Sequence, residues 1–143
     1  MNDSISDLYT RLRNASLVGH DEVHVPWTKM NERVVQILLQ QGFVLSYQTV
    51  PQFSKALESP KTLIITLKYK NSSKAKAPII TQIRRLSRPG CRIYVQSKQI
   101  PNLLRSLQAF GTPILFLSTS RGILSDRDAR AFNVGGEVLG IVS

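Results

Sequence analysis

The sequence ILFLSTSRGILS at residues 114–125 decides the fold of the second half of this chain. Its apolar run, Ile114–Leu117, predicts a buried strand, and the strand ends in three small hydroxyl residues, Ser118–Ser120. Arg121-Gly122 then predicts a turn. Hydroxyls donate and accept hydrogen bonds while leaving room for a bulky partner. Since no carboxylate or histidine stands beside them, we expect this stretch to grip a partner rather than to catalyse a reaction.

Downstream of this stretch, the sequence predicts a short capped helix and a closing strand. Ser125 and Asp128 have the spacing of a capping box, with Asp in place of the usual Glu. Gly135-Gly136 lets a backbone come close to a partner or turn sharply. Glu137 is a lone acid in a basic region, suited to accept hydrogen bonds from hydroxyls or base amino groups. Val138–Val142 predicts the strand that closes the sheet.

Upstream, a basic hairpin is predicted, with strands at residues 79–87 and 92–95 around a Pro-Gly turn. Arginine forks match phosphate oxygens, and guanidinium planes also stack on bases. Tyr94 lies among the arginines and either stacks on a base or ribose or fills the sheet. Cys91 is expected to be a half-buried strand residue. Four arginines fall within nine residues of this hairpin: Arg84, Arg85, Arg88 and Arg92.

The positive charge of the chain is concentrated in its second half. The net charge is +10 over 143 residues. Residues 1–60 hold five Lys or Arg and six Asp or Glu, whereas residues 61–143 hold fourteen and three. The basic half is also rich in structure-forming residues, which favours a folded surface for a polyanion over a loose tail. A role in solubility alone is the alternative.

The order of predicted elements indicates an α+β fold in two modules. Residues 1–70 form an N-terminal α/β module, 71–78 a linker, and 79–143 a mostly antiparallel β module with one main helix. The charge of this second module leads us to expect that it binds nucleic acid. In the α/β module, the predicted order is helix, strand, helix, strand, strand. Hydrophobic periodicity places these elements at residues 3–15, 22–25, 29–41, 43–50 and 61–70, and the main helix of the second module at 100–110.

The first helix offers a weaker signal for RNA. Thr10, Arg11, Arg13 and Asn14 lie beside or opposite its apolar face, so they either touch phosphate or form a solvated face. His20 and His24 stand four apart on a turn and a strand, which separates them, so we expect no metal site. A serine hydrolase built from residues 118–120 and one of these histidines is a remote alternative, because no Gly-x-Ser-x-Gly elbow surrounds the serines.

Seven sequence motifs occur in one order along nearly the whole chain. They are LYTRLRNA at 8–15, the segment from Val25-Pro26 to Gly42-Phe43, RLSRPG at 85–90, RIY at 92–94, LSTSRG at 117–122, DRDAR at 126–130 and VGGEVL at 134–139. Together they resemble the signatures of the bacterial-type small-subunit ribosomal protein S8 family. The motifs of the second half are specific as a set, although each alone is weak.

This resemblance implies a protein that binds the central domain of small-subunit rRNA directly and early in assembly, next to neighbouring small-subunit proteins. The hydroxyl loop then reaches into a distorted minor groove of the RNA. The resemblance implies no enzyme activity, cofactor, small-molecule substrate or membrane partner. The candidate RNA-binding residues are Thr10, Arg11, Asn14, Arg84, Arg85, Arg88, Arg92, Tyr94, Ser118, Thr119, Ser120, Arg121, Gly122, Gly135, Gly136 and Glu137.

The chain also departs from the family pattern. It ends in Ile141-Val142-Ser143 where the family has an aromatic residue, and the loop at 50–60 and the segment at 107–113 are longer than usual. These differences favour a divergent ribosome. We expect the ribosome of an organelle, a chloroplast rather than a mitochondrion, or that of a bacterial cytoplasm. Translational repression through a messenger that mimics the rRNA site, or general RNA binding, is the alternative function.

Overall fold

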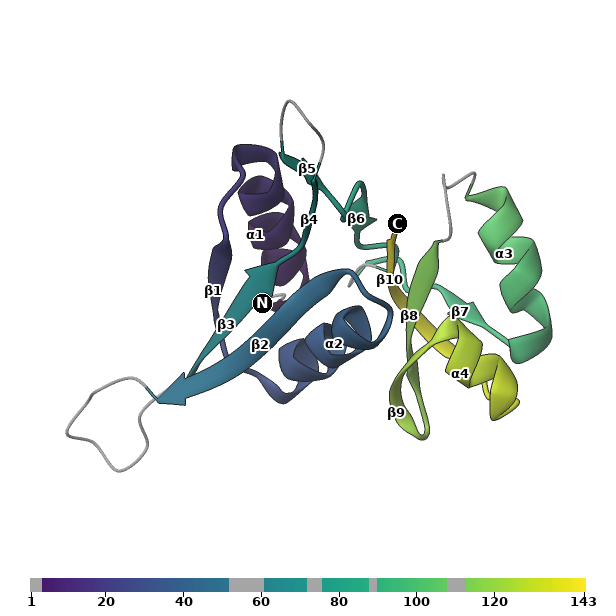
Figure 1. The fold of residues 1–143 in the computed structure, drawn as a ribbon. Helices are drawn as coiled ribbons and strands as arrows, with labels where there is room; N and C mark the ends of the chain where they lie inside the picture. The colour runs from purple at the N-terminus through teal and green to yellow at the C-terminus, as the bar shows by residue number, and fades with distance from the viewer. Residues whose placement is uncertain (1–3, 52–60, 72–75, 88–89, 108–112) are drawn as a thin grey trace. The chain divides into compact units, whose positions relative to one another are not determined.

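The computed structural model describes residues 4–51, 61–71, 76–87, 90–107 and 113–143. The chain divides into two compact units, Met1–Ile80 and Thr81–Ser143, each of which mixes helices with antiparallel strands (Figure 1). The predicted α+β class is confirmed. None of the helices in these ranges has the length and apolar character that crossing a bilayer requires.

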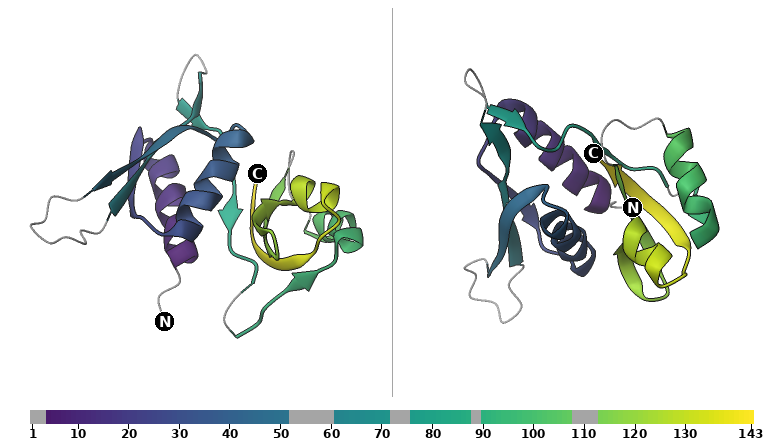
Figure 2. Two further views of the ribbon diagram at one scale, coloured as in Figure 1. Left: turned by 90° about the horizontal axis from the view of Figure 1, so that it is seen from below. Right: turned by 45° about the vertical axis from the view of Figure 1, so that its right-hand side comes forward.

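The first unit begins with the predicted order of helix, strand, helix, strand, strand and adds a small hairpin. Its sheet is antiparallel with strand order β1-β3-β2, and both long helices lie against one side of it (Figure 2). The elements are α1 (Ser4–Val18), β1 (Glu22–Pro26), α2 (Lys29–Gln40), β2 (Val44–Pro51), β3 (Lys61–Leu67), β4 (Tyr69–Asn71) and β5 (Lys76–Pro78).

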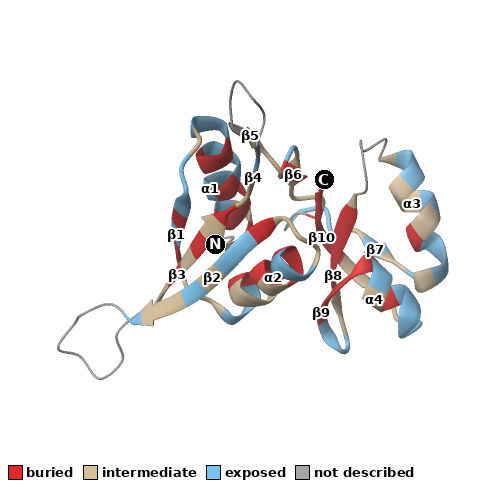
Figure 3. Ribbon diagram, in the orientation of Figure 1, coloured by how far each residue is buried: buried red, intermediate tan, exposed pale blue. Residues whose placement is uncertain are grey.

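Hydrophobic spacing explains the core of the first unit. β3 alternates, so that Leu63, Ile65 and Leu67 are buried while the residues between them are only half-buried. Thr28 caps α2 by accepting a hydrogen bond from the backbone N–H of Asn31. The apolar stripe of α1 is buried as predicted at Ile5, Leu8, Leu12 and Ala15 (Figure 3).

The inner face of α2 differs from the predicted stripe. Val34, Ile37 and Leu38 are buried as expected, but Met30 is 40% exposed. Asn31 takes its place in the interior and donates through its side-chain amide to the carbonyl of Pro26 at 3.2 Å. The hydrogen bond to the preceding strand rotates the first turn of the helix inward at the asparagine, which the apolar pattern does not reveal.

The segment predicted as a linker, 71–78, overlaps a hairpin. β4 pairs antiparallel with β5, from Tyr69 opposite Pro78 to Asn71 opposite Lys76. Residues 72–75 lie outside the described residues. The first compact unit therefore extends to Ile80, ten residues beyond the boundary predicted from composition.

The second unit centres on its last strand, β10, which pairs with β6 and β7 on one side and β8 on the other. β8 continues to β9 through a tight hairpin. A core cluster beneath this sheet joins Leu115, Leu117 and Val138 to Ile100 and Ala129 of the two helices. The elements are β6 (Ile83–Arg84), β7 (Tyr94–Val95), η1 (Ser97–Gln99), α3 (Ile100–Ser106), β8 (Ile114–Thr119), β9 (Gly122–Ser125), α4 (Asp126–Ala131) and β10 (Gly136–Val142).

The predicted basic hairpin is more irregular than the sequence indicates. In place of strands at 79–87 and 92–95, the structure has two-residue strands, β6 and β7. Thr81 and Gln82 instead donate their backbone N–H groups to the carbonyl of Ser143. Cys91 precedes the strand and is exposed, so its predicted half-buried position is wrong. The Arg-Pro pair at 88–89 and the predicted end of the helix at 108–111 lie outside the described residues.

Candidate RNA interface

The hydroxyl stretch forms the turn of the β8–β9 hairpin. Thr119 is paired with Gly122, and its Oγ1 donates to the Gly122 carbonyl at 2.8 Å and accepts from the backbone N–H of Arg121 at 3.1 Å. Gly122 has φ +95°, a left-handed backbone that favours glycine. Thr119 therefore locks the turn, and Ser120 is left exposed at its tip.

Three candidate residues lie in one row across the sheet. Glu137 of β10 is paired with Tyr94 of β7 and with Ser118 of β8. Directly paired residues of antiparallel strands project from the same face. The next row, Leu117 opposite Val138, belongs to the core under α3 and α4. The hydroxyl row, defined as Tyr94, Glu137 and Ser118, therefore faces away from the helices, and the Tyr94 side chain is 66% exposed.

Glu137 is engaged by the protein itself. Its Oε1 accepts from the Ser87 hydroxyl at 2.7 Å and from Nη1 of Arg92 at 2.8 Å, and its side chain is only 13% exposed. Ser87 is fully buried, and its Oγ also accepts from the backbone N–H of Ile93 at 3.1 Å. The sequence predicted that Glu137 accepts a hydrogen bond from a hydroxyl, and in the structure this hydroxyl is that of Ser87. The sequence did not indicate Ser87, because it stands fifty positions from Glu137.

The glycine pair serves a close approach within the protein. A Cβ on Gly136 would lie 2.0 Å from the carbonyl oxygen of Ser118, and one on Gly135 would lie 2.3 Å from that of Val95. Neither glycine has a positive φ. The sequence predicted a close approach to a partner or a sharp turn, whereas the close approach in the structure is to the neighbouring strands β7 and β8.

Two of the four arginines of the basic hairpin, Arg85 and Arg92, lie near Ser87. Arg92 reaches it through Glu137, and Nε of Arg85 donates to the Ser87 carbonyl. Arg84 is paired with Ile141 at the edge of the sheet and is half-buried. Arg88 lies outside the described residues. Arg92 stays exposed over almost half of its side chain, so one cation remains accessible beside the hydroxyl row.

Arg121 lies on the helix side. Its guanidinium sits over the ring of Phe132, the residue that follows α4, at 4.6 Å from the ring centroid. Stacking of this kind is a cation–π contact. The sequence predicted a place for Arg121 beside the hydroxyls, but it did not indicate the aromatic partner.

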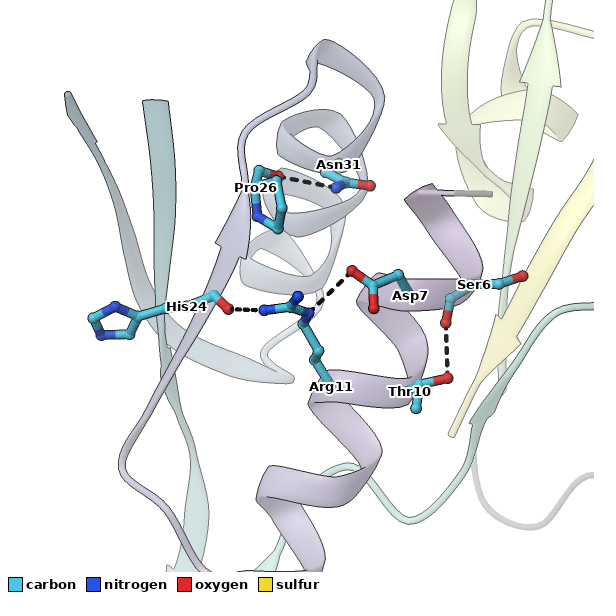
Figure 4. Close-up of polar contacts among 7 residues, drawn as sticks. All are labelled: Ser6, Asp7, Thr10, Arg11, His24, Pro26 and Asn31. Carbon is cyan, nitrogen blue, oxygen red and sulfur yellow. Dashed lines mark hydrogen bonds and ion pairs between the residues drawn. The ribbon is translucent and has the colours of Figure 1, made fainter. Parts of the chain in front are cut away.

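The candidate residues of α1 make contacts within the first unit (Figure 4). Arg11 donates from Nε to Asp7 at 3.0 Å and from Nη1 to the His24 carbonyl at 2.9 Å, which ties α1 to β1. The hydroxyl of Thr10 donates to the Ser6 carbonyl at 2.9 Å. Asn14 is exposed. These residues lie in another unit than the hydroxyl row, and the structure leaves the choice between phosphate contact and solvated face open for them.

A buried carboxylate, that of Asp126, holds α4 to the strand that leads to the hydroxyls. Asp126 is 3% exposed, and its Oδ1 accepts from the backbone N–H of Leu115 at 3.1 Å, joining α4 to the start of β8. Burial raises the pKa of Asp126, against the opposite effects of that hydrogen bond and of the Arg127 and Arg130 guanidinium groups. Ser125 caps α4 as predicted, accepting from the Asp128 N–H at 3.3 Å.

Metal and hydrolase chemistry find little support in the geometry. Within the described residues, no group of three or more His, Cys, Asp and Glu side chains could hold a metal ion. His24 lies 3.6 Å from Glu22 on β1. The hydroxyl of Thr119 is already hydrogen-bonded within the turn. The arrangement can therefore bind through hydroxyls, an aromatic ring and cations.

Comparisons with known proteins identify the family of the chain. The family model described as Ribosomal protein S8 matches residues 3–143. The small ribosomal subunit protein uS8c of Tetradesmus obliquus is 46% identical over 143 residues, which cover 97% of this chain and 96% of that protein. The uS8 protein of Gloeobacter violaceus is 42% identical, with the same shares covered. The chain belongs to the ribosomal protein S8 family, and its role is that of a structural protein of the small ribosomal subunit.

Proposed function

We propose that this protein binds the central domain of the small-subunit rRNA directly, through the hydroxyl row and the exposed tip of the β8–β9 turn, and thereby supports assembly of the subunit. The observation that carries the proposal is the row itself. Pairing across three strands sets Ser118 and the exposed Tyr94 on the sheet face that α3 and α4 leave uncovered.

The chemistry of this row suits RNA. Duplex RNA presents a wide, shallow minor groove with 2′-hydroxyls and base edges, and irregular segments expose further base edges. The Ser118 and Ser120 hydroxyls can both donate to and accept from such groups. An exposed tyrosine ring offers a stacking surface for a base. Because Glu137 is already held by Ser87 and Arg92, its part is to fix Arg92 beside the row rather than to contact a base.

Charge supplies the part of the affinity that does not depend on sequence. Residues 81–143 hold nine Lys or Arg and three Asp or Glu. Two of these acids, Asp126 and Glu137, are largely buried. The exposed surface of the unit is therefore more basic than the net charge alone indicates. Neutralising phosphates releases counterions, so binding should weaken steeply as salt rises.

The test is a substitution at the turn tip. Ser120→Leu places a bulky side chain at the tip without changing charge. We expect affinity for a central-domain rRNA transcript to fall at least tenfold, about 1.4 kcal/mol, while the unfolding midpoint stays unchanged. Ser106→Leu, an exposed serine of α3, is the matched control and should bind as the wild type does. Unchanged binding by Ser120→Leu, or equal losses in both variants, would count against the proposal.

We also propose that the ribosome in question is that of a chloroplast. Relatives in the algae Tetradesmus obliquus and Rhodomonas salina carry the name uS8c, and the latter is 42% identical to this chain. An antibody against the protein should detect it in chloroplast ribosomes sedimented from fractionated cells. Detection in mitochondrial or cytosolic ribosomes instead would refute this assignment.

A further inference from the structure

The helix-bearing side of the second unit carries cations that the hydroxyl row does not use. Arg127 and Arg130 stand three positions apart on α4 and are exposed, while Asp126 and Ala129 point into the protein. Residues at this spacing are neighbours on a helix surface. Two like charges side by side weaken a helix by a few tenths of a kcal/mol. Both guanidinium groups also interact with the carboxyl of Asp126, the first residue of α4.

Two further cations adjoin the end of α4. Arg121 is stacked on Phe132, and both side chains are exposed. A guanidinium that lies flat on a ring keeps its edge N–H groups available for a phosphate. Lys98 is exposed on η1, which contacts α4, and the Ser97 hydroxyl donates to Oδ1 of Asn133 at 2.8 Å. We define the helix-side patch as Lys98, Arg121, Arg127 and Arg130.

Acidic groups are fewer than the cations of this patch. The second unit has three acids, Asp126, Asp128 and Glu137. Asp126 is 3% exposed and is bound to the backbone of β8, and Glu137 is bound to Arg92 on the other face of the sheet. Asp128, which is half-buried, is the acid that remains on α4. Four exposed cations thus stand beside two carboxylates of α4, and one of these, Asp126, is almost fully buried.

The patch and the hydroxyl row face opposite ways. Row residues alternate along β8 and β10 with Leu117 and Val138, which pack under α3 and α4. The helices and the exposed surface of α4 thus lie on one side of the sheet, and Ser118 lies on the other. Arg121 adjoins the turn tip, but a single stretch of RNA groove that seats the row would lie on the other side of the sheet from Arg127 and Arg130. These two arginines therefore suit an occupant of their own.

We propose that the helix-side patch binds the phosphate backbone of a second RNA segment, so that the unit holds two segments of the rRNA from opposite faces of its sheet. This proposal rests on the proposed function. Three of the four cations are arginines, whose planar forks match phosphate oxygens, and one is held in place by an aromatic ring. These features favour RNA phosphates over an acidic protein segment.

The first experiment measures binding of a central-domain rRNA transcript over a range of salt concentrations. Arg127→Glu with Arg130→Glu should lower the affinity at least tenfold and reduce the slope of log affinity against log salt by about 1.5 units, the share of two phosphates. Arg127→Gln with Arg130→Gln should give the same direction with a smaller loss, and it guards against a folding defect. Lys29→Glu with Lys70→Glu, exposed lysines of the first unit, is the charge-matched control.

The outcomes separate the two proposals. If the wild-type chain fails to bind the transcript, the proposed function itself is wrong. If the wild type binds and Ser120→Leu weakens binding, but the Arg127 and Arg130 variants keep the wild-type affinity and slope, the second contact is wrong and the first stands. Equal losses of affinity in the control and in the Arg127 and Arg130 variants would show that the loss reflects the net charge of the protein rather than a specific site. That result would also overturn the second contact.

A second experiment locates the two RNA segments. An iron chelate attached to Cys91, the single and exposed cysteine, reports on the row side, because the next residue is Arg92. The same chelate on Ala131→Cys, in a chain with Cys91→Ser, reports on the exposed side of α4. Hydroxyl radicals should cut two separate sets of nucleotides in the bound transcript. One shared set, or no cuts from position 131, would contradict a second segment.

Discussion

The two units build antiparallel sheets by different means. In the first, the central strand β3 buries Leu63, Ile65 and Leu67 against the helices, and none of its three strands contains a glycine. In the second, the central strand β10 contains Gly136 and Gly140. Side-chain burial stabilises both sheets, and the second adds a close backbone approach at Gly136.

Two polar contacts that join elements, one in each unit, differ in how far they are buried. Arg11 ties α1 to β1 with a side chain that is 46% exposed. Ser87 and Glu137 tie β10 to the segment before β7 from positions that are fully or mostly buried. Buried polar groups cost far more than exposed ones when a partner is lost. Of these two contacts, the one between Ser87 and Glu137 is thus the more sensitive to substitution.

The largest effect is expected at Gly136. In Gly136→Ala the new methyl would lie 2.0 Å from the Ser118 carbonyl, a backbone atom that cannot move alone. We expect a loss of about 4 kcal/mol of stability, in the range of severe single substitutions, with faster hydrogen exchange at the amides of β8 and β10. Gly19→Ala, at φ +88° in open space, should cost only about 1–2 kcal/mol in the first unit. Equal costs would remove the contrast between the sheets.

Loss of Glu137 is expected to come next. Glu137→Ala leaves the buried Ser87 hydroxyl and the Arg92 guanidinium without their acceptor. Stability in urea should fall by about 2 kcal/mol, the usual cost of an unsatisfied buried group. Glu137→Gln keeps an acceptor oxygen and should lose less. A destabilisation smaller than that of an exposed polar substitution would show that the buried network is not what holds β10.

Sequence patterns predicted the elements that local rules control. The alternation of Leu63, Ile65 and Leu67 identified β3, and the helical spacing of residues such as Leu8 and Leu12 identified α1. The Ser125 cap also followed from spacing alone. Each of these features depends on residues within one turn or one strand of each other. The α+β class and the order of the first five elements follow from such patterns.

Other features depend on residues that are distant in sequence. The partner of Glu137 is Ser87, and the atom that excludes a side chain at Gly136 belongs to Ser118. The stack of Arg121 on Phe132 needs the turn of β9 into α4. Composition also mistook residues 76–78 for linker, because Lys-Ala-Pro lacks an apolar pattern although it pairs with β4. The candidate hydroxyls were therefore identified from sequence, but the contacts that position them were not.

A smaller effect is expected in the first unit at Arg11. Arg11→Ala removes the hydrogen bonds to Asp7 and to the His24 carbonyl, both at an exposed position. The cost should be about 1 kcal/mol or less, as for other exposed ion pairs. Unfolding is followed by fluorescence of Trp27, the single tryptophan, which lies in the first unit. A loss as large as that of Glu137→Ala would contradict the contrast in burial between the two polar contacts.

The smallest effect, and the one with a defined pH dependence, is expected at Asp126. Burial raises its pKa in the folded state above the ordinary value of 3.8. Between the two values the folded state binds more protons than the unfolded state, so the contribution of this carboxyl to stability falls as pH rises through the raised pKa. Asp126→Asn does not titrate, and its amide oxygen can still accept from the Leu115 N–H. When unfolding in urea is measured from neutral to acidic pH, the stability of the wild type relative to this variant should therefore increase. A stability difference that stays constant, or that changes with the opposite sign, would show that burial does not govern the titration of Asp126.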